Sequence, residues 1–109
     1  MDAQKIAEGE RHAEAEIINP ASEEVIDTVI LGDQLDVDAA VAAARKAFES
    51  FSQTTVAERI ALLENIIKVY NQRMSELADV ISQELGAPLS LAQIAQAPAG
   101  RDHFDATLE

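Results

Sequence analysis

Two short apolar runs joined by a turn, followed only by helix patterns, limit this chain to a mainly helical fold. The runs Glu16–Ile18 and Val25–Ile30 flank a turn in which Asn19 and Pro20 favour type I geometry. Successive residues of a strand point to opposite faces, and both faces of the second run carry valine or isoleucine. We therefore expect a β-hairpin that needs cover from elsewhere, because a lone hairpin is marginally stable in water.

An alanine-rich helix is predicted next, over Val37–Phe48. Its apolar stripe has a helical period and comprises Leu35, Val37, Ala40, Val41, Ala44, Ala47, Phe48 and Phe51. Asp33 is suited to cap the helix, and Asp36 falls in the first turn near the positive end of the dipole. The many alanines would allow a close approach to another backbone.

Another helix is predicted to start at Thr55, where Glu58 completes a capping-box pattern. Its inward stripe comprises Ile60, Leu63, Ile67, Tyr70 and Met74, widened by Leu62 and Ile66. We expect Ser75 to cap a third helix that ends at Gly86, because Pro88 prevents continuation. The inward residues of this third helix are Leu77, Ala78, Ile81 and Leu85.

The last part of the chain predicts a broken helix. A short apolar helix is expected over Leu89–Ala97, with an interruption at Pro98–Gly100. A further turn or two is expected over Arg101–Leu108.

Taken together, these patterns predict a mainly α fold with a short N-terminal β-hairpin. A chain of 109 residues forms one domain at most. Residues 1–15 are predicted to be an acidic polar tail, and residues 16–109 a hairpin plus four to five helices. No later strand pattern exists from which a parallel sheet could be built.

Charge and hydropathy exclude several classes of partner. The formal net charge is −12, which opposes binding to nucleic acid phosphates or to an anionic membrane surface. No apolar run reaches the ~20 residues that a membrane span requires, and the acidic N-terminus does not resemble a signal peptide. A cytoplasmic location is therefore expected.

The residue types argue against catalysis by this chain alone. It contains no cysteine, which excludes disulfides, thiolate nucleophiles and cysteine-ligated metals. His12 and His103 have no ordered set of metal ligands around them in the sequence and are expected to be surface residues. Glu8, Glu10, Glu14 and Glu16 lack the spacing of a calcium loop and predict a solvated face. Capping roles are expected of Ser52, Thr54 and Thr55.

The ordered set of motifs resembles the N-terminal part of the NAD(P)-dependent aldehyde dehydrogenases. The resemblance covers nearly everything from Ile17 onward. It is carried by Asn19–Ile26, Asp36–Asp38, Ala40–Phe48, Arg59, Leu62, Leu63, Arg73, Glu76–Ala78 and Glu84–Leu89. The chain departs from the family pattern at Glu23, where many members have glycine, at Ala87, where many have lysine, and at Phe51, which is often tryptophan.

The resemblance implies the helical N-terminal part of an α/β coenzyme-binding domain. In that family the full-length protein oxidises an aldehyde to a carboxylic acid with NAD or NADP. The nucleotide-binding strands, the catalytic cysteine and the general-base glutamate come later than the region matched here. We therefore expect no catalytic residue, no cofactor-binding residue and no bound cofactor in this chain, and an aldehyde substrate only in a full-length protein.

Three positions take candidate roles from the resemblance alone. Glu84 matches an acidic position that in some relatives helps to hold a structural monovalent cation. Ala95 and Ala99 match positions that line the substrate entrance in relatives. Surface exposure is the alternative for Glu84, and plain helix packing is the alternative for the two alanines.

The apolar faces also predict self-association, because large exposed apolar patches are uncommon on soluble monomers. This leaves an alternative function open. The chain could be a truncated helical module for oligomerisation or protein interaction, or a gene remnant without catalytic function.

Overall fold

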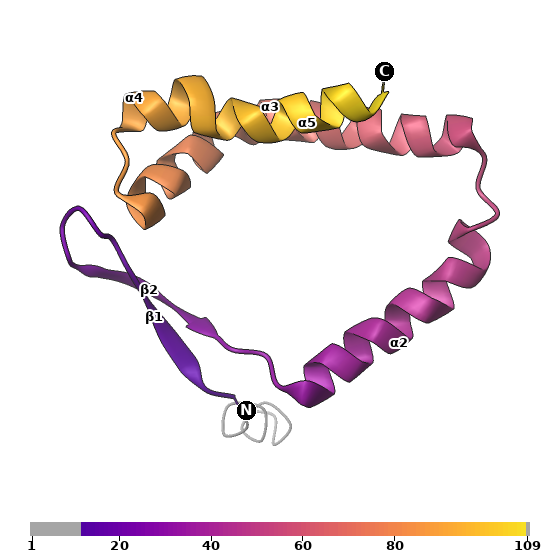
Figure 1. The fold of residues 1–109 in the computed structure, drawn as a ribbon, viewed down its shortest axis with the longest axis horizontal. Coiled ribbons are helices and arrows are strands. Elements are labelled where there is room, and N and C mark those ends of the chain that lie inside the picture. The colour runs from indigo at the N-terminus through magenta and orange to yellow at the C-terminus, as the bar shows by residue number, and fades with distance from the viewer. Residues whose placement is uncertain (1–11, 109) are drawn as a thin grey trace. The chain divides into compact units, whose positions relative to one another are not determined.

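The computed structural model describes residues 12–108 and is mainly helical with an N-terminal hairpin, as the sequence predicted (Figure 1). Its elements are β1 (Glu14–Ile18), β2 (Val25–Ile30), α2 (Gln34–Phe51), α3 (Val56–Leu85), α4 (Leu89–Leu91), the π-helix η1 (Ala92–Gln96) and α5 (Ala97–Leu108). The two strands form a two-stranded sheet. The described chain divides into two compact units, one with residues 12–17 and 25–53, the other with residues 18–24 and 54–108.

The hairpin turn is organised by Asn19. Its side-chain Oδ1 accepts hydrogen bonds from the backbone N–H groups of Ala21 (2.9 Å) and Ser22 (3.4 Å). Its carbonyl oxygen accepts from the N–H of Glu23 at 2.8 Å. Glu23 has φ 62°, in the left-handed region that glycine adopts most easily. This backbone conformation gives a physical reason why glycine would suit the position.

The N-terminus of α2 carries the predicted cap. The backbone N–H of Asp36 donates to Asp33 Oδ1 at 3.1 Å, and the N–H of Asp33 donates to Asp36 Oδ2 at 2.8 Å. The two aspartates thus form a reciprocal capping box. Within this unit β2 is exposed along its whole length and α2 has no buried residue. Its apolar faces are therefore open.

Helix α3 begins where the sequence predicted and then runs without a break to Leu85. Thr55 and Glu58 form the expected capping box, with the Thr55 N–H donating to Glu58 Oε2 at 2.7 Å. These bonds lower the pKa of Glu58, first through the backbone of Thr55 and then through its hydroxyl. The prediction that Ser75 starts a new helix was wrong. Ser75 is followed three residues later by Ala78, which cannot return the bond that Glu58 gives to Thr55.

The C-terminus of α3 ends at Gly86, as predicted. Gly86 has φ 66°, and a Cβ there would lie 2.9 Å from the backbone nitrogen of Ala21 and 3.0 Å from Pro20 Cγ. Gly86 therefore serves both the left-handed cap and a close approach of the hairpin turn. Ser82 Oγ donates to the carbonyl of Ala87, just beyond the helix, at 2.7 Å and ties the following loop to the last turn of α3.

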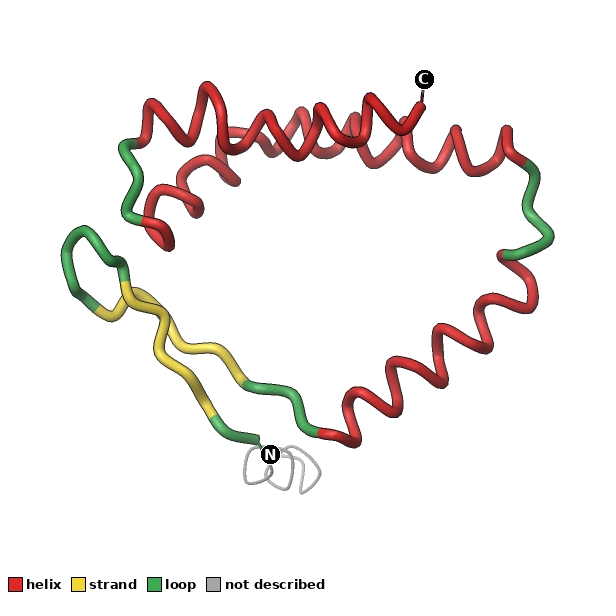
Figure 2. The backbone as a smooth tube through the Cα atoms, viewed as in Figure 1, coloured by secondary structure: helices red, strands yellow, loops and turns green. Residues whose placement is uncertain are grey.

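The interruption predicted at Pro98–Gly100 was wrong. Figure 2 shows one continuous helical path from α4 through η1 to α5. Within that path the Ala97 N–H donates to the Ala92 carbonyl, five residues back. The widened π turn accommodates Pro98, so the helical path continues through the proline instead of ending before it.

The second unit is a pair of helical segments, α3 and the path α4–η1–α5, packed side by side (Figure 1). Its buried centre consists of Ala78 (1% exposed), Ala92 (0%) and Ala97 (0%). Met74, Leu77 and Ile81 pack against these alanines. The predicted inward stripe of α3 is therefore confirmed at these positions, but Leu85 is 61% exposed and its inward prediction was wrong.

None of the helices in residues 12–108 combines the length and the hydrophobicity needed to span a membrane.

We predict that Gly86→Ala lowers the free energy of unfolding by about 1–3 kcal/mol, because alanine is strained at this φ and its Cβ would meet backbone. Urea denaturation followed by circular dichroism measures the change. Gly32→Ala is the matched control, since its nearest atoms would lie at 3.7 Å, an ordinary contact. Equal unfolding midpoints for the two variants would contradict the assignment.

Candidate functional site

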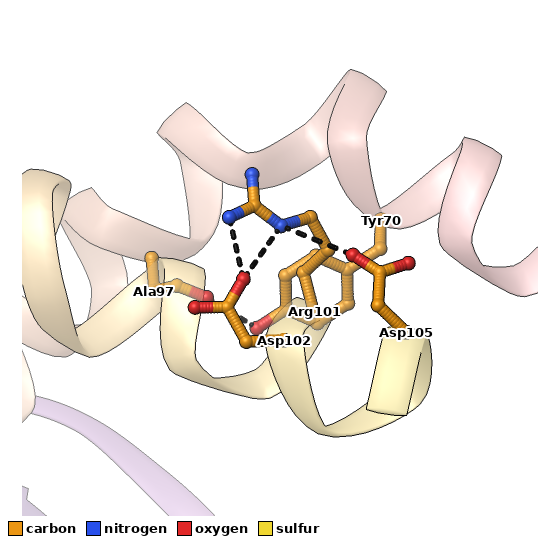
Figure 3. A network of polar contacts seen from close by, with 5 residues as sticks. All are labelled: Tyr70, Ala97, Arg101, Asp102 and Asp105. Carbon is orange, nitrogen blue, oxygen red and sulfur yellow. Dashed lines mark hydrogen bonds and ion pairs between the residues drawn. The ribbon is translucent and has the colours of Figure 1, made fainter. Parts of the chain in front are cut away.

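The contact between α3 and α5 is organised by Tyr70. Its hydroxyl donates to the Ala97 carbonyl at 2.7 Å (Figure 3). Its ring meets that of Phe104 edge-on, with centroids 6.3 Å apart and an interplanar angle of 62°. A Cβ at Gly100 would overlap the Tyr70 hydroxyl, so glycine makes room for the ring. One tyrosine therefore contacts α5 at three successive turns.

An acidic pair surrounds Arg101 on the same helix (Figure 3). Its Nε and Nη2 atoms both donate to Asp102 Oδ1, and its Nε lies 3.7 Å from Asp105 Oδ2. The hydrogen bonds and charge of Asp102 raise the pKa of Arg101 above its already high value. The guanidinium therefore remains charged and cannot act as a general base.

A shallow apolar groove of about 460 Å³ runs along α3. Its lining residues are Ile66, Val69, Tyr70, Arg73, Glu76, Leu77 and Val80. Arg73 and Glu76 pair at 3.0 Å and supply its charged groups. All of these residues belong to one helix, whereas a catalytic pocket normally brings polar groups together from several elements.

In the first unit, His12 lies beside the cap of α2. Its Nε2 is 2.7 Å from Asp36 Oδ2, and its side chain is only 13% exposed, so the prediction of a surface histidine was wrong. Asp33 completes a group whose possible ligand atoms lie within 4.8 Å of one another. Both carboxylates already cap the helix, whose positive N-terminal end favours anions over a metal cation. The arrangement indicates a helix cap that a histidine extends. No local pattern predicts it, because 24 residues separate His12 from Asp36.

The residues with candidate roles from the resemblance lie at the end of α3 and on the second helical segment. Glu84 is exposed in the last turn of α3, and the possible metal-ligand group found within residues 12–108 does not include it. Ala95 in η1 and Ala99 in α5 are both exposed on the second helical segment.

Several other candidate residues lie where the sequence predicts them. His103 is exposed, as predicted. Glu14 and Glu16 are exposed on one face of β1, which begins at Glu14, while Glu8 and Glu10 lie outside the described residues. Thr55 is the cap that was predicted.

Comparison with known protein families identifies the family of the chain. The model of the aldehyde dehydrogenase family matches residues 6–109. The chain belongs to the aldehyde dehydrogenase family.

Individual relatives agree with the family assignment. A 3-succinoylsemialdehyde-pyridine dehydrogenase from a Pseudomonas species is 46% identical over 92 residues, which cover 84% of this chain and 19% of that protein. The crystal structure of an aldehyde dehydrogenase C mutant from Pseudomonas syringae, in complex with NAD+ and octanal, matches with a TM-score of 0.83 and 40% identity. That match covers 85% of this chain and 19% of the other.

An aldehyde dehydrogenase from Bartonella henselae matches with the same TM-score, 0.83, and 36% identity, over 85% of this chain and 20% of that one. The chain thus spans about a fifth of the length of the relatives it matches and corresponds to an N-terminal portion of an aldehyde dehydrogenase.

We predict that His12→Ala destabilises the first unit by about 1–2 kcal/mol, because it removes a half-buried hydrogen bond to a carboxylate. Thermal unfolding measures the loss. His103→Ala, at the exposed histidine of α5, is the matched control and should leave the melting temperature unchanged. A similar effect of both substitutions would show that the pairing of His12 with Asp36 does not stabilise the fold.

Proposed function

We propose that this aldehyde dehydrogenase segment is the N-terminal scaffold of an NAD(P)-binding domain. The full-length protein would oxidise an aldehyde to a carboxylic acid, with the hydride passing to the nicotinamide. Support comes from the family match and from the relative that was crystallised with NAD+ and octanal. The proposed location of the enzyme is the cytoplasm.

The observation that carries this proposal is the apolar surface that the segment leaves open. Ile94 is 77% exposed, Val56 71% and Phe48 68%. Among the described residues only three alanines are buried. A helical unit with so small a core needs a complementary apolar surface, and the remaining four-fifths of an aldehyde dehydrogenase would supply it.

The division of chemical roles follows from the residues present. The chain has no cysteine, so a thiolate nucleophile for the aldehyde carbon would have to come from another part of the enzyme. The Tyr70 hydroxyl joins α3 to α5, and the carboxylates of Asp102 and Asp105 pair with Arg101 on their own helix. We assign this chain a supporting role and no catalytic or cofactor-binding residue of its own.

Two site proposals extend the scaffold role. Ala95 and Ala99 would form part of the substrate entrance of the full-length enzyme, where small exposed side chains leave room for the aldehyde. Glu84 would provide one oxygen ligand to a structural monovalent cation. Its place in the last turn of α3 supports this, because the negative end of a helix dipole favours cations.

A chimera tests the scaffold proposal. Residues 12–108 would replace the matching segment of the wild-type Pseudomonas syringae enzyme, and NADH formation would be followed with octanal and NAD+. We expect the chimera to turn over, and the 109-residue chain alone to produce no NADH. Turnover by the chain alone would contradict the expectation that it is inactive.

The chimera has an internal control in Ala97→Asp, which places an unpaired charge at a fully buried position and should abolish soluble, active protein. A chimera that folds to the native size yet oxidises no octanal would contradict the scaffold role.

The same exposed surface favours a second candidate function, a self-associating interaction module. The apolar groove on α3, defined above, would be covered by a second copy of the chain. Mutual repulsion opposes this association, because each copy carries a net charge of −12. Added salt should therefore strengthen it by screening.

We predict that sedimentation velocity of the free chain shows a mass that rises with protein concentration and with salt. Val69→Glu, in the groove, should weaken this association. Val56→Glu, at an equally apolar but separate exposed position, is the control and should have less effect. A compact monomer at high concentration would exclude the self-associating module.

A further inference from the structure

The π turn in η1 decides which residues of the second helical segment face α3. Ala92 and Ala97 are both 0% exposed although five residues separate them. In a regular α-helix, residues five apart point roughly 140° away from each other. The bond from the Ala97 N–H to the Ala92 carbonyl closes a wider turn, and this turn allows both alanines to be buried against the same partner.

Pro98 makes the regular α-helical alternative unfavourable at this point. Proline has no N–H to donate to the carbonyl of Ile94, and its ring would clash with that carbonyl in an α-helical turn. The extra residue of the π turn moves the carbonyl out of the way. The sequence therefore favours a widened turn, but it does not by itself fix how α5 is rotated after that turn.

Tyr70 makes contacts that depend on this rotation. Its hydroxyl bonds the Ala97 carbonyl, immediately after the π turn. The ring reaches Phe104 two turns further on, and Gly100 between them lacks the Cβ that would displace it. Rotating α5 by one residue, about 100°, would remove all three contacts together.

We propose that Tyr70 is a positioning residue that locks the π turn and sets the rotation of α5. The lock keeps Ala92 and Ala97 on α3 and leaves Ile94, Ala95 and Ala99 on the outside of the segment. If the proposed function holds, the same lock orients the residues assigned to the substrate entrance. The lock itself is independent of that function and is tested without enzyme activity.

Two single-residue deletions in the full chain test the rotation. In a Pro98→Ala background, deletion of Ala95 removes the extra residue of the π turn and leaves α5 in its original rotation. Deletion of Ala99 with Pro98 retained is the control. The proline keeps the π turn, so Phe104 rotates away from Tyr70 and the Cβ of Arg101 takes the place of Gly100, where it would displace the Tyr70 hydroxyl. We expect the first deletion to keep a cooperative thermal transition near that of Pro98→Ala and the second to lose it or lower it strongly.

The substitution Tyr70→Phe tests whether the Tyr70 hydroxyl is the group that holds the π turn. In the parent chain and in the Ala95-deletion background it should lower the melting temperature by roughly 4–8 °C, the effect of one lost hydrogen bond in a domain of this size. In the Ala99-deletion background it should have no further effect, because the Cβ of Arg101 at the place of Gly100 has already displaced the Tyr70 hydroxyl from the Ala97 carbonyl. Equal effects of Tyr70→Phe in both deletion backgrounds, or equal damage by both deletions, would overturn the proposal.

Amide hydrogen exchange gives a readout that survives if a deletion variant does not fold. Tyr70→Phe in the parent chain should raise exchange at the Ala97 N–H about five- to tenfold, because the bond across the π turn opens more often. His103→Ala on the exposed side of α5 is the control and should leave this exchange unchanged. Unaltered exchange at Ala97 in the Tyr70→Phe variant would also overturn the proposal.

Discussion

The close packing of α3 on the second helical segment is the contact on which the helical unit depends. It works because the residues at the closest approach are alanines, with Ala78 on one side and Ala92 and Ala97 on the other. Small side chains bring two helix backbones together but bury little apolar area each. The alanines let the two helical segments approach closely but make no directional contact. The directional contact is the hydrogen bond from the Tyr70 hydroxyl to the Ala97 carbonyl.

The small size of this core connects the fold with the family assignment. A segment covering about a fifth of an aldehyde dehydrogenase carries exposed valine, isoleucine, leucine and phenylalanine on both the hairpin and the helices. Such surfaces are expected of a piece whose complement lies elsewhere in a larger protein, or on another copy. Polar side chains of the described residues cap the helices, pair within a helix and join α3 to α5. These contacts hold the elements in place.

Local sequence patterns predict the parts of the structure that depend on neighbouring residues. The caps at Asp33 and Thr55 and the left-handed end at Gly86 all involve residues within a few positions of one another. The wrong predictions concern residues whose effect depends on their partners. Ser75 stays inside α3 because no reciprocal side chain supports a new start there. Pro98 stays inside a helix because the turn before it widens.

By itself, the sequence determined the hairpin, the mainly helical class, the family and the absence of a cysteine nucleophile. These follow from periodicity, from capping chemistry and from an ordered set of motifs. Only the tertiary structure decided that His12 joins the cap at Asp36, that Tyr70 reaches Ala97, and which face of α5 is covered. These contacts join residues more than twenty positions apart. The partner of such a residue is set by how whole elements pack, and no local pattern in the sequence records it.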